Sequence, residues 1–340
     1  MISTWGASNG LNSGLSFFLP LSDAGSGAVT TTPASSAGLP TPTFTRATVA
    51  WTKLSTGLWA SVASGTARSC YLGATTAVGA YGGYFAEPAG TQLVTPTASI
   101  RDMTNGAWVA VNVTAAKDAT GIDGVANSAS TLTAGAIGGS IQQTLVAAAS
   151  SRTYSVWLRR KTGTGTITIN QGATTSDVTA QLNALTYTRV SLNASVLNAA
   201  FGITFGTSGD AVEADFNQFE AGAAATSPMA SAGAARNADV LTYPTSGNFS
   251  DAAGTVYAEY ASPAWTALSN IMNVGDGGVS SSVLFAVSNT VPAAAFDGTN
   301  LTNGPTVSAV TGVVKGATSW SGSSATCFIN GNVGTPGTYD

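Results

Sequence analysis

Histidine is absent from this chain of 340 residues. Its absence excludes Ser-His-Asp and Cys-His nucleophiles, histidine-ligated zinc and histidine proton shuttles. Only carboxylate, tyrosine or lysine chemistry remains open, and the sequence has no dense cluster of acids and tryptophans of the kind a glycan-degrading site needs. We therefore expect a structural and binding protein rather than an enzyme, with no cofactor other than a candidate structural calcium ion.

Charged side chains are also scarce. The chain has 12 basic and 16 acidic residues, or 8% of the total, against roughly 25% in an ordinary soluble domain. An amphipathic helix has charged side chains on the face that meets water, and this chain has too few charged residues to supply that face for many helices. The 40 glycines suit short strands joined by tight turns. The composition therefore predicts an all-β fold built of sandwiches or barrels.

Long apolar runs and long basic runs are missing too. No stretch approaches the roughly 18 to 20 apolar residues of a membrane-spanning helix, and no basic segment precedes an apolar one at the start, so we expect neither membrane insertion nor a secretory signal. The net charge is −4 and the one basic cluster is Arg159-Arg160-Lys161, which disfavours nucleic acid as a partner. That cluster fits either an anion contact or a solvated strand end. Cys70 and Cys327 are interpreted as buried thiols, with a disulfide as the alternative.

Residues 1–46 are predicted to form an N-terminal attachment arm. Its apolar patch contains Leu15, Phe17, Phe18 and Leu19, and a stretch of Ser, Thr, Ala, Gly and Pro without periodicity follows. Such a segment buries too little surface to offset the entropy of ordering, so we expect it to become ordered against a partner subunit. A flexible terminus is the alternative.

The rest of the chain divides by its alternation of apolar and polar residues. Residues 47–95 are predicted to be a small β-rich connector, residues 96–235 a jelly-roll β-sandwich, and residues 236–340 the start of a second sandwich that continues beyond Asp340. Asn330-Gly331 is a type I′ hairpin signal. The predicted strands in the two sandwiches include 108–113, 153–158, 165–170, 187–192, 201–205, 212–219, 255–260, 283–287 and 324–329.

Three segments resemble a modular family of bacteriophage virion proteins. The first segment opens with residues 43–47, Phe-Thr-Arg-Ala included, and continues through residues 57–59 and 65–68, which are similar to the opening of that family's connector. It ends with residues 83–93, which are similar to the family's Glu-Pro element. Residues 219–228 resemble the exit of its carbohydrate-binding-module-like jelly roll. Residues 236–241 and 256–260 resemble the entry to a concanavalin-like lectin sandwich. The connector departs from the family at residues 69–73, where the usual acidic run is absent, so no role of those acids is carried over.

The resemblance implies a structural role on a particle surface. The leading interpretation is a virion protein, as a head fibre, tail fibre, spike or decoration subunit, that assembles as a homotrimer, docks on capsid or tail proteins through its arm and contacts host-surface glycans. A free carbohydrate-binding adhesin or module is the alternative. A carboxylate-dependent glycan-degrading enzyme is the third.

Glu213 and Asp215 are the candidate metal ligands. They lie two apart in a predicted strand, so both face one side, where paired carboxylates could bind calcium. Structural use of the two acids is the competing interpretation. A second group, Lys117, Asp118 and Asp123, lacks the spacing of an EF-hand and predicts a turn held by side-chain hydrogen bonds instead.

Trp265 and Trp320 are the candidate glycan-stacking residues. Exposed aromatic rings are how a β-sandwich stacks on sugars, and these two tryptophans lie beside Gly/Ser-rich loops. Core packing is the alternative for any tryptophan in the chain.

Overall fold

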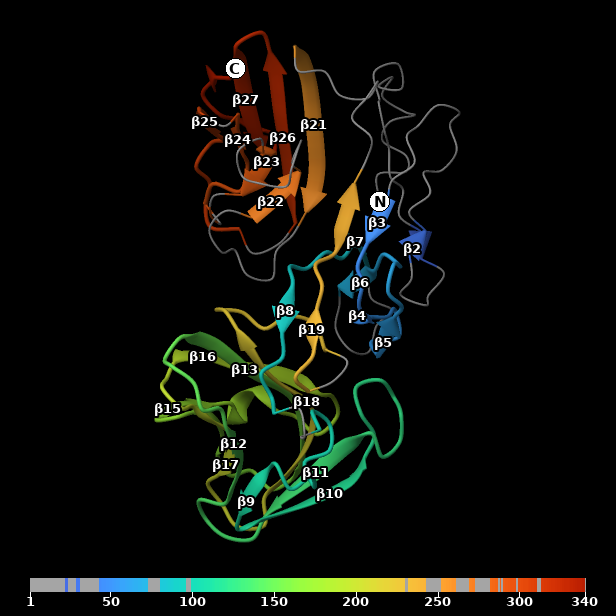
Figure 1. Ribbon diagram of the computed structural model, residues 1–340, viewed down its shortest axis with the longest axis vertical. Coiled ribbons are helices and arrows are strands. Elements are labelled where there is room, and N and C mark those ends of the chain that lie inside the picture. Colours follow the sequence, from blue (N-terminus) through green and yellow to red (C-terminus); the bar gives the residue numbers. More distant parts are fainter. Residues whose placement is uncertain are drawn as a thin grey trace. The chain divides into compact units, whose positions relative to one another are not determined.

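The computed structural model describes residues 22–23, 29–30, 43–72, 80–95, 99–229, 232–242, 252–260, 269–272, 282–286, 288, 290–297, 299–310 and 313–339. Within these ranges the ordered elements are strands, apart from a 3₁₀ turn, η2, at Thr179–Gln181 (Figure 1). The prediction of an all-β protein is confirmed. None of the described segments forms an apolar helix long enough to cross a bilayer.

The chain divides into two compact units, one ending at Tyr243 and the other beginning at Pro244. This division lies several residues after residue 235, where the sequence predicts the start of the second sandwich. The reason is that β19 (Ala235–Arg236) pairs with β8 (Gly90–Thr91), and β20 (Val240–Thr242) pairs with β3 (Thr43–Thr45). The segment after the jelly roll thus returns to the connector before the chain leaves the first unit.

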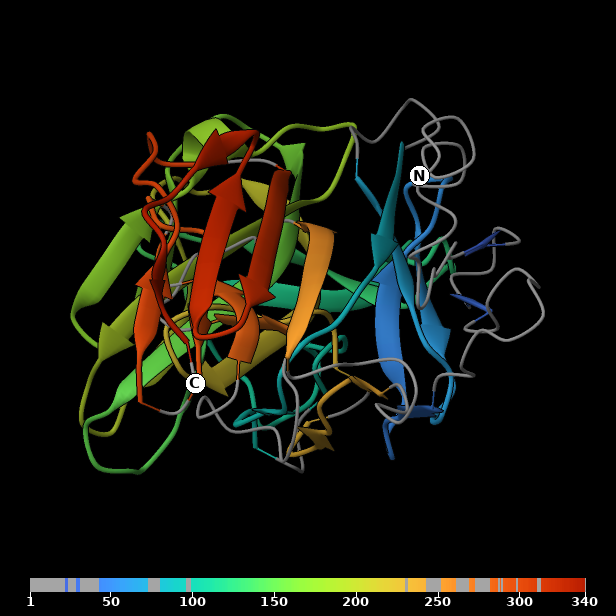
Figure 2. The same ribbon diagram turned by 90° about the horizontal axis from the view of Figure 1, so that it is seen from above.

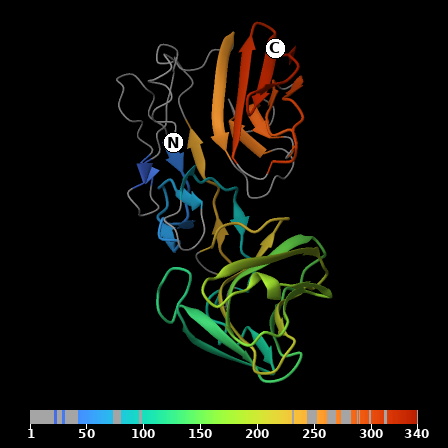
Figure 3. The same cartoon turned by 180° about the vertical axis from the view of Figure 1, so that it is seen from behind.

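The jelly roll consists of two antiparallel five-stranded sheets that share one core (Figures 1 and 3). The first sheet has the order β10-β11-β18-β13-β16, formed by Val113–Ala119, Ala129–Ala134, Ala211–Ala221, Ser151–Thr162 and Thr188–Ser195. The second has the order β15-β14-β17-β12-β9, formed by Thr174–Asp177, Ile167–Gln171, Ala200–Phe205, Ser140–Thr144 and Val109–Val111.

Alternation along the strands builds the jelly-roll core. Phe201, Ile203 and Phe205 project inward from β17 and are buried, because successive side chains of a strand point to opposite faces. From the first sheet, Phe219 stacks on Phe201 with ring centroids 4.2 Å apart, and Tyr154 lies against the same ring. Aromatic contacts between the two sheets therefore join the halves of the sandwich.

The connector is a set of short hairpins in the same compact unit. β4 (Ala50–Lys53) pairs with β5 (Trp59–Val62), and β6 (Ser69–Leu72) pairs with β7 (Ala80–Tyr84). Its Trp59 reaches the outer face of the first jelly-roll sheet, where it meets Trp157 with ring centroids 5.4 Å apart. Part of that face is thus covered by the connector. In the arm, β1 (Ser22–Asp23) pairs with β2 (Val29–Thr30), while Leu15, Phe17, Phe18 and Leu19 lie outside the described residues.

The C-terminal unit also has two sheets, whose strands run next to one another in orange to red (Figure 2). β21, β26 and β27 form the body of one sheet, with β28 and β29 both pairing with β27. Its core contains Val256, Leu284, Trp320 and Ile329. The first sheet comprises Ala253–Tyr260 (β21), Val314–Ser321 (β26), Ser324–Ile329 (β27), Asn332–Val333 (β28) and Gly337–Thr338 (β29). The second comprises Ser269–Met272 (β22), Ser282–Ala286 (β23), Ala294–Phe296 (β24) and Leu301–Asn303 (β25).

The strongest local signals are reproduced by the structure. Asn330 and Gly331 have φ angles of 50° and 85°, and they join β27 to β28, as a type I′ turn requires. The strand predicted over 108–113 is interrupted at Asn112, whose φ of 52° is one that asparagine tolerates better than most residues. Strands β11 and β26 were not predicted, because threonine, serine and alanine dominate them and give little apolar alternation.

Candidate functional site

A buried cluster of charges, which we term the connector node, contains Arg46, Arg68, Glu87, Arg236 and Asp239. Arg46 Nη1 donates to Asp239 Oδ1 at 2.6 Å, and Arg68 bonds both Asp239 and Glu87 Oε2. Arg236 Nη1 lies 3.6 Å from Glu87 Oε2. Burial lowers the pKa of Arg236, and Glu87 opposes that shift. The side chains of Arg46, Arg68 and Asp239 have no solvent exposure, so these ions are held by one another.

The connector node joins segments that are far apart in the sequence. Arg46, Arg68 and Glu87 come from the connector, whereas Arg236 and Asp239 follow the jelly roll. Each of these residues lies in a stretch that carries the family resemblance. The sequence indicates these stretches but not the contact between them. One sequence signal could have pointed to this cluster. The chain has few charged residues, and these five all occur within the short motifs of the resemblance.

A second charged cluster, the Arg101 clamp, holds one of the candidate metal ligands. Arg101 Nε donates to Asp215 Oδ1 at 2.7 Å, and Arg101 Nη1 donates to Asp123 Oδ2 at 2.7 Å. Gly121 passes so close that a Cβ there would lie 2.5 Å from Asp215 Oδ2. The guanidinium also lies over the ring of Phe216, 4.4 Å from its centroid. Phe216 has a φ of 44°, a left-handed conformation that is costly for a bulky residue.

The clamp and its neighbours argue against the predicted calcium site. The Asp215 oxygens accept hydrogen bonds from Arg101 and from the backbone N–H groups of Ile122 and Phe216. Glu213 is bonded by Arg159 Nε at 2.6 Å. In the part of the chain that the structure describes, no three histidine, cysteine, aspartate or glutamate residues are grouped to hold a metal. Arginine therefore supplies the positive charge that calcium would have brought, and the structural interpretation of both acids is the one that fits.

Burial and hydrogen bonding act in opposite directions on the clamp acids. Burial raises the pKa of Asp215, although Arg101 and two backbone N–H groups bond its charged form. Partial burial also acts to raise the pKa of Asp123, but the hydrogen bonds from Arg101, Val125 and Ser128 prevail and lower it. Val125 N–H donates to Asp123 Oδ1 at 3.1 Å, so the predicted side-chain-bonded turn is confirmed for Asp123.

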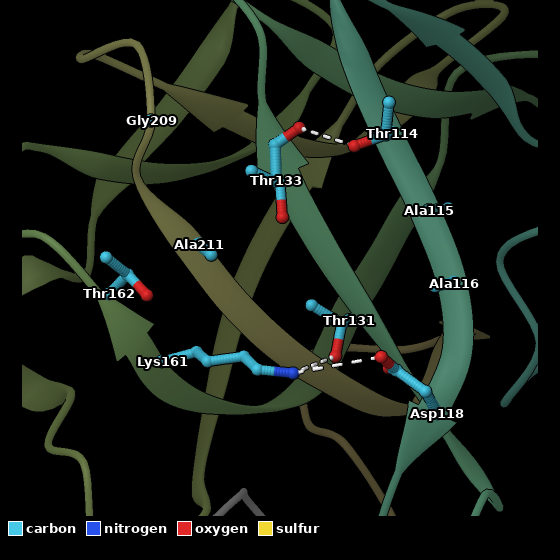
Figure 4. A pocket seen from close by; sticks show the side chains of 10 residues that line it. All are labelled: Thr114, Ala115, Ala116, Asp118, Thr131, Thr133, Lys161, Thr162, Gly209 and Ala211. Carbon is cyan, nitrogen blue, oxygen red and sulfur yellow. Dashed lines mark hydrogen bonds and ion pairs between the residues drawn. The ribbon is translucent and has the colours of Figure 1, made fainter.

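An open groove of about 330 Å³ lies on the outer face of the first jelly-roll sheet, across β10, β11, β18 and β13 (Figure 4). Its floor follows the register of the sheet, since Thr114 is opposite Thr133 and Thr133 is opposite Ala211. Small side chains on neighbouring strands leave the groove open. The lining residues are Thr114, Ala115, Ala116, Asp118, Thr131, Thr133, Lys161, Thr162, Gly209 and Ala211.

Both charged residues of the groove are positioned by irregularities in the strands. The pairing of β13 with β18 shifts between Arg160 and Thr162, and that of β10 with β11 shifts between Ala116 and Ala119. Such bulges re-aim the side chains of the extra residues. Lys161 lies within the first of these irregularities and Asp118 within the second, and the two side chains point toward each other in Figure 4. The groove therefore depends on strand register, which composition and alternation do not reveal.

The groove presents mixed hydrogen-bonding groups in a nearly neutral setting. Lys161 Nζ donates to Thr131 Oγ1 at 2.8 Å and lies 3.9 Å from Asp118 Oδ2 and 3.8 Å from Glu213 Oε1. The other two residues of the basic cluster Arg159-Arg160-Lys161 form ion pairs, Arg159 with Glu213 and Arg160 with Asp210. Threonine hydroxyls donate and accept, the ammonium donates and the carboxylates accept. This set is complementary to a ligand with several hydroxyl groups.

The two candidate stacking tryptophans have different outcomes. Trp320 has 4% of its surface exposed and belongs to the core of the C-terminal unit, beside Tyr339. A Cβ on Gly254 would lie 2.7 Å from its ring atom Cη2, so the ring is packed on that side as well. Because it has no open face for a sugar, Trp320 is a core residue, and the stacking prediction is wrong for it. Trp265 lies outside the described residues.

Comparisons with known proteins do not assign a family. No family model matches the sequence, and no curated protein matches it. One similar solved structure is the CBM22-1–GH10 region of endo-1,4-β-D-xylanase 10B from Clostridium thermocellum, complexed with xylohexaose, at 12% identity and a TM-score of 0.29 over 41% of this chain and 30% of that one. Another is the C-terminal CBM6 of the laminarinase LamC from Zobellia galactanivorans, at 10% identity and a TM-score of 0.25 over 36% and 98% of the two chains. Likenesses at this level do not establish a function.

Proposed function

We propose that this protein is a noncatalytic glycan-contact protein and that the groove over β10, β11, β18 and β13 binds sugar hydroxyl groups. The observation that carries the proposal is the grouping of four threonines with Lys161 and Asp118 around one open groove. Protein–sugar contacts of this kind rest on donors and acceptors at fixed positions, with each charged hydrogen bond contributing about 1.5–3 kcal/mol. The ligand class is a neutral or weakly charged saccharide.

The environment of the acids supports a binding role over hydrolysis. A glycosidase keeps one carboxyl group protonated in apolar surroundings. Near the groove, Glu213 is bonded by Arg159 and flanked by Lys161, while the Asp118 side chain is 53% exposed. Lys161 Nζ lies 3.9 Å from Asp118 Oδ2 and 3.8 Å from Glu213 Oε1, so neither carboxylate has the apolar surroundings that a glycosidase's acid requires.

The matched test compares two lysines. Lys161 and Lys117 have side chains 41% and 43% exposed, and each pairs with an aspartate, but only Lys161 lines the groove. After a glycan array has identified a ligand, calorimetric titration should show that Lys161→Met weakens binding by roughly 10- to 100-fold. Lys117→Met should bind like the unmodified chain. Equal affinities for both variants, or no saccharide bound at millimolar concentration, would refute the groove as the site.

We further propose that the sandwiches are carried on a virion surface, where the chain assembles as a homotrimer and docks on capsid or tail proteins through residues 1–46. The observation in favour is that the segments resembling phage virion proteins supply all five residues of the connector node. Mass photometry of the full chain and of a variant lacking residues 1–46, each mixed with particles devoid of the protein, tests this. A trimer that binds particles only with the arm supports it, and a monomer indifferent to particles refutes it.

A further inference from the structure

A row of apolar side chains crosses the first sheet of the C-terminal unit. Tyr257 on β21 is opposite Ala317 on β26, Ala317 is opposite Phe328 on β27, and Phe328 is opposite Val333 on β28. Tyr257 is 48% exposed and Val333 is 61% exposed. None of the four belongs to the core cluster of this unit, to which the alternate residues Val256 and Ile329 contribute. We name these four residues the aromatic row.

The spacing of the aromatic row is set by the sheet. Neighbouring strands are ~4.8 Å apart, so Tyr257 and Phe328, two strands apart, are separated by ~10 Å. Ala317 lies between them, and its small side chain leaves space above the sheet. This separation equals about two sugar units of an extended polysaccharide, so alternate sugar rings can lie on the two aromatic side chains while the ring between them passes over Ala317.

Polar groups border the aromatic row on both sides. On one side Thr255, Ser319 and Thr326 form a line of hydroxyl groups across the same three strands, with Thr255 Oγ1 donating to Ser319 Oγ at 3.1 Å. On the other side Glu259 pairs with Lys315 at 3.9 Å. Tyr257 donates its hydroxyl hydrogen to Glu259 Oε1 at 2.7 Å, which holds the phenol ring in place. The border is neutral overall and rich in donors and acceptors.

The row also meets a second groove at one end. Val333 is part of the lining of a groove of about 470 Å³ that contains Thr302, Asn303 and Thr335. At its Val333 end, the apolar surface of the row therefore continues into a groove lined by more polar side chains. A sugar chain has apolar ring faces and hydroxyl edges, and this surface offers a partner for each.

We propose that the aromatic row binds an extended, uncharged polysaccharide chain running across β21, β26, β27 and β28. Sugar rings stack on Tyr257 and Phe328, and hydroxyl groups bond the line of Thr255, Ser319 and Thr326. The apolar strip is one residue wide between polar borders, whereas the interfaces of obligate dimers are broad and hydrophobic. A sugar chain thus fits this face better than a second copy does. The site is separate from the jelly-roll groove and does not depend on it.

The test measures two linear hexasaccharides by calorimetry against the full chain. Cellohexaose is extended, whereas maltohexaose coils, so the row should bind cellohexaose at least tenfold more tightly. Phe328→Ala removes one stacking ring. Ala317→Arg leaves both rings but raises a bulky side chain between them, and because Ala317 faces away from the core this variant keeps the fold. Val313→Arg is the matched control, since Val313 is 55% exposed and lies off the row.

The expected result is that Phe328→Ala and Ala317→Arg each weaken cellohexaose binding by about tenfold or more, while Val313→Arg leaves it unchanged. Equal binding by all variants, or equal affinity for the two hexasaccharides, overturns the proposal. Binding that Lys161→Met abolishes and Ala317→Arg preserves assigns the sugar to the jelly-roll groove and also overturns it. So does a concentration-dependent dimer in sedimentation velocity that Ala317→Arg dissociates, in the absence of any sugar binding.

Discussion

The two compact units use charge in different ways. All eight arginines of the chain precede residue 244, and the only basic residue after that point is Lys315. In the first unit the arginines bind carboxylates below the surface, at the connector node and in the Arg101 clamp. In the C-terminal unit the described ion pair, Lys315 with Glu259, lies on the outer face of a sheet. Among the described residues, the buried ion pairs thus join segments of the first unit.

The difference follows from what each unit must hold together. The first unit brings the connector, the jelly roll and the returning segment 235–242 into contact, and their short strands offer few ladder hydrogen bonds. A bidentate guanidinium can bond two segments at once with defined geometry. The C-terminal unit pairs longer strands, with β21 and β26 matched over eight residues, and it packs Trp320 at its centre. Among the described residues of that unit, backbone pairing and apolar packing hold the strands together, and the ion pair is at the surface.

The largest effect is expected from breaking the connector node. Asp239→Asn removes the carboxylate that Arg46 and Arg68 share, so the buried Arg46 guanidinium loses its carboxylate partner and Arg68 keeps only Glu87. Losing one partner of a buried ion pair costs about 3–5 kcal/mol, so chemical denaturation should show a loss of this size in the first unit. Asp177→Asn, at an exposed acid of β15, is the control and should change stability little. If Asp239→Asn is as stable as Asp177→Asn, the buried charges do not hold the connector to the segment that follows the jelly roll.

A medium effect is expected on the acid dependence of the first unit. Hydrogen bonds from Arg101 outweigh burial and lower the pKa of Asp123, and hydrogen bonds from Thr104 and the Lys117 charge do the same for Asp102. A carboxyl group whose pKa is lower in the folded state contributes stability above its ordinary pKa, about 4, and loses it as the pH falls through the folded value. The thermal midpoint of the first unit should therefore drop below about pH 4.

Substitution at Asp123 sharpens that pH comparison. Asp123→Asn should lower stability at neutral pH and flatten the acid limb, because the variant has no carboxyl group to protonate there. Asp215 acts in the opposite sense, since burial raises its pKa. Calorimetric scans of the unmodified chain and of Asp123→Asn from pH 2 to 7 measure how the stability of each falls in acid. An unchanged slope in Asp123→Asn would mean that other acids set the acid dependence.

The smallest effect is expected at the surface ion pair of the C-terminal unit. The side chains of Lys315 and Glu259 are 62% and 32% exposed, and exposed pairs contribute about 0–1 kcal/mol. Lys315→Ala should therefore shift the unfolding free energy by less than about 1 kcal/mol. Urea denaturation in low and high salt measures it. A loss as large as that of Asp239→Asn would remove the contrast between the two units.

Local patterns predicted much of the fold. Alternation located β13, β17, β18 and β21, and Asn330-Gly331 predicted its hairpin, because strand faces and left-handed turns depend on neighbouring residues. The candidate sites were harder to predict. Glu213 and Asp215 were correctly placed on one strand, but their partners, Arg159 and Arg101, come from elsewhere in the chain. Sequence spacing could not show which cation would meet them.

The sequence by itself determined that this protein is built of strands, since scarce charge and abundant glycine, serine and threonine do not support amphipathic helices. It also excluded every mechanism that needs histidine. The tertiary structure alone decided which distant charges meet at the connector node, which residues of bulged strands line the groove, and that Trp320 is buried while Tyr257 is exposed. The physical reason is that strand pairing and register are set by long-range contacts, and a shift of one residue exchanges the buried and exposed faces of a strand.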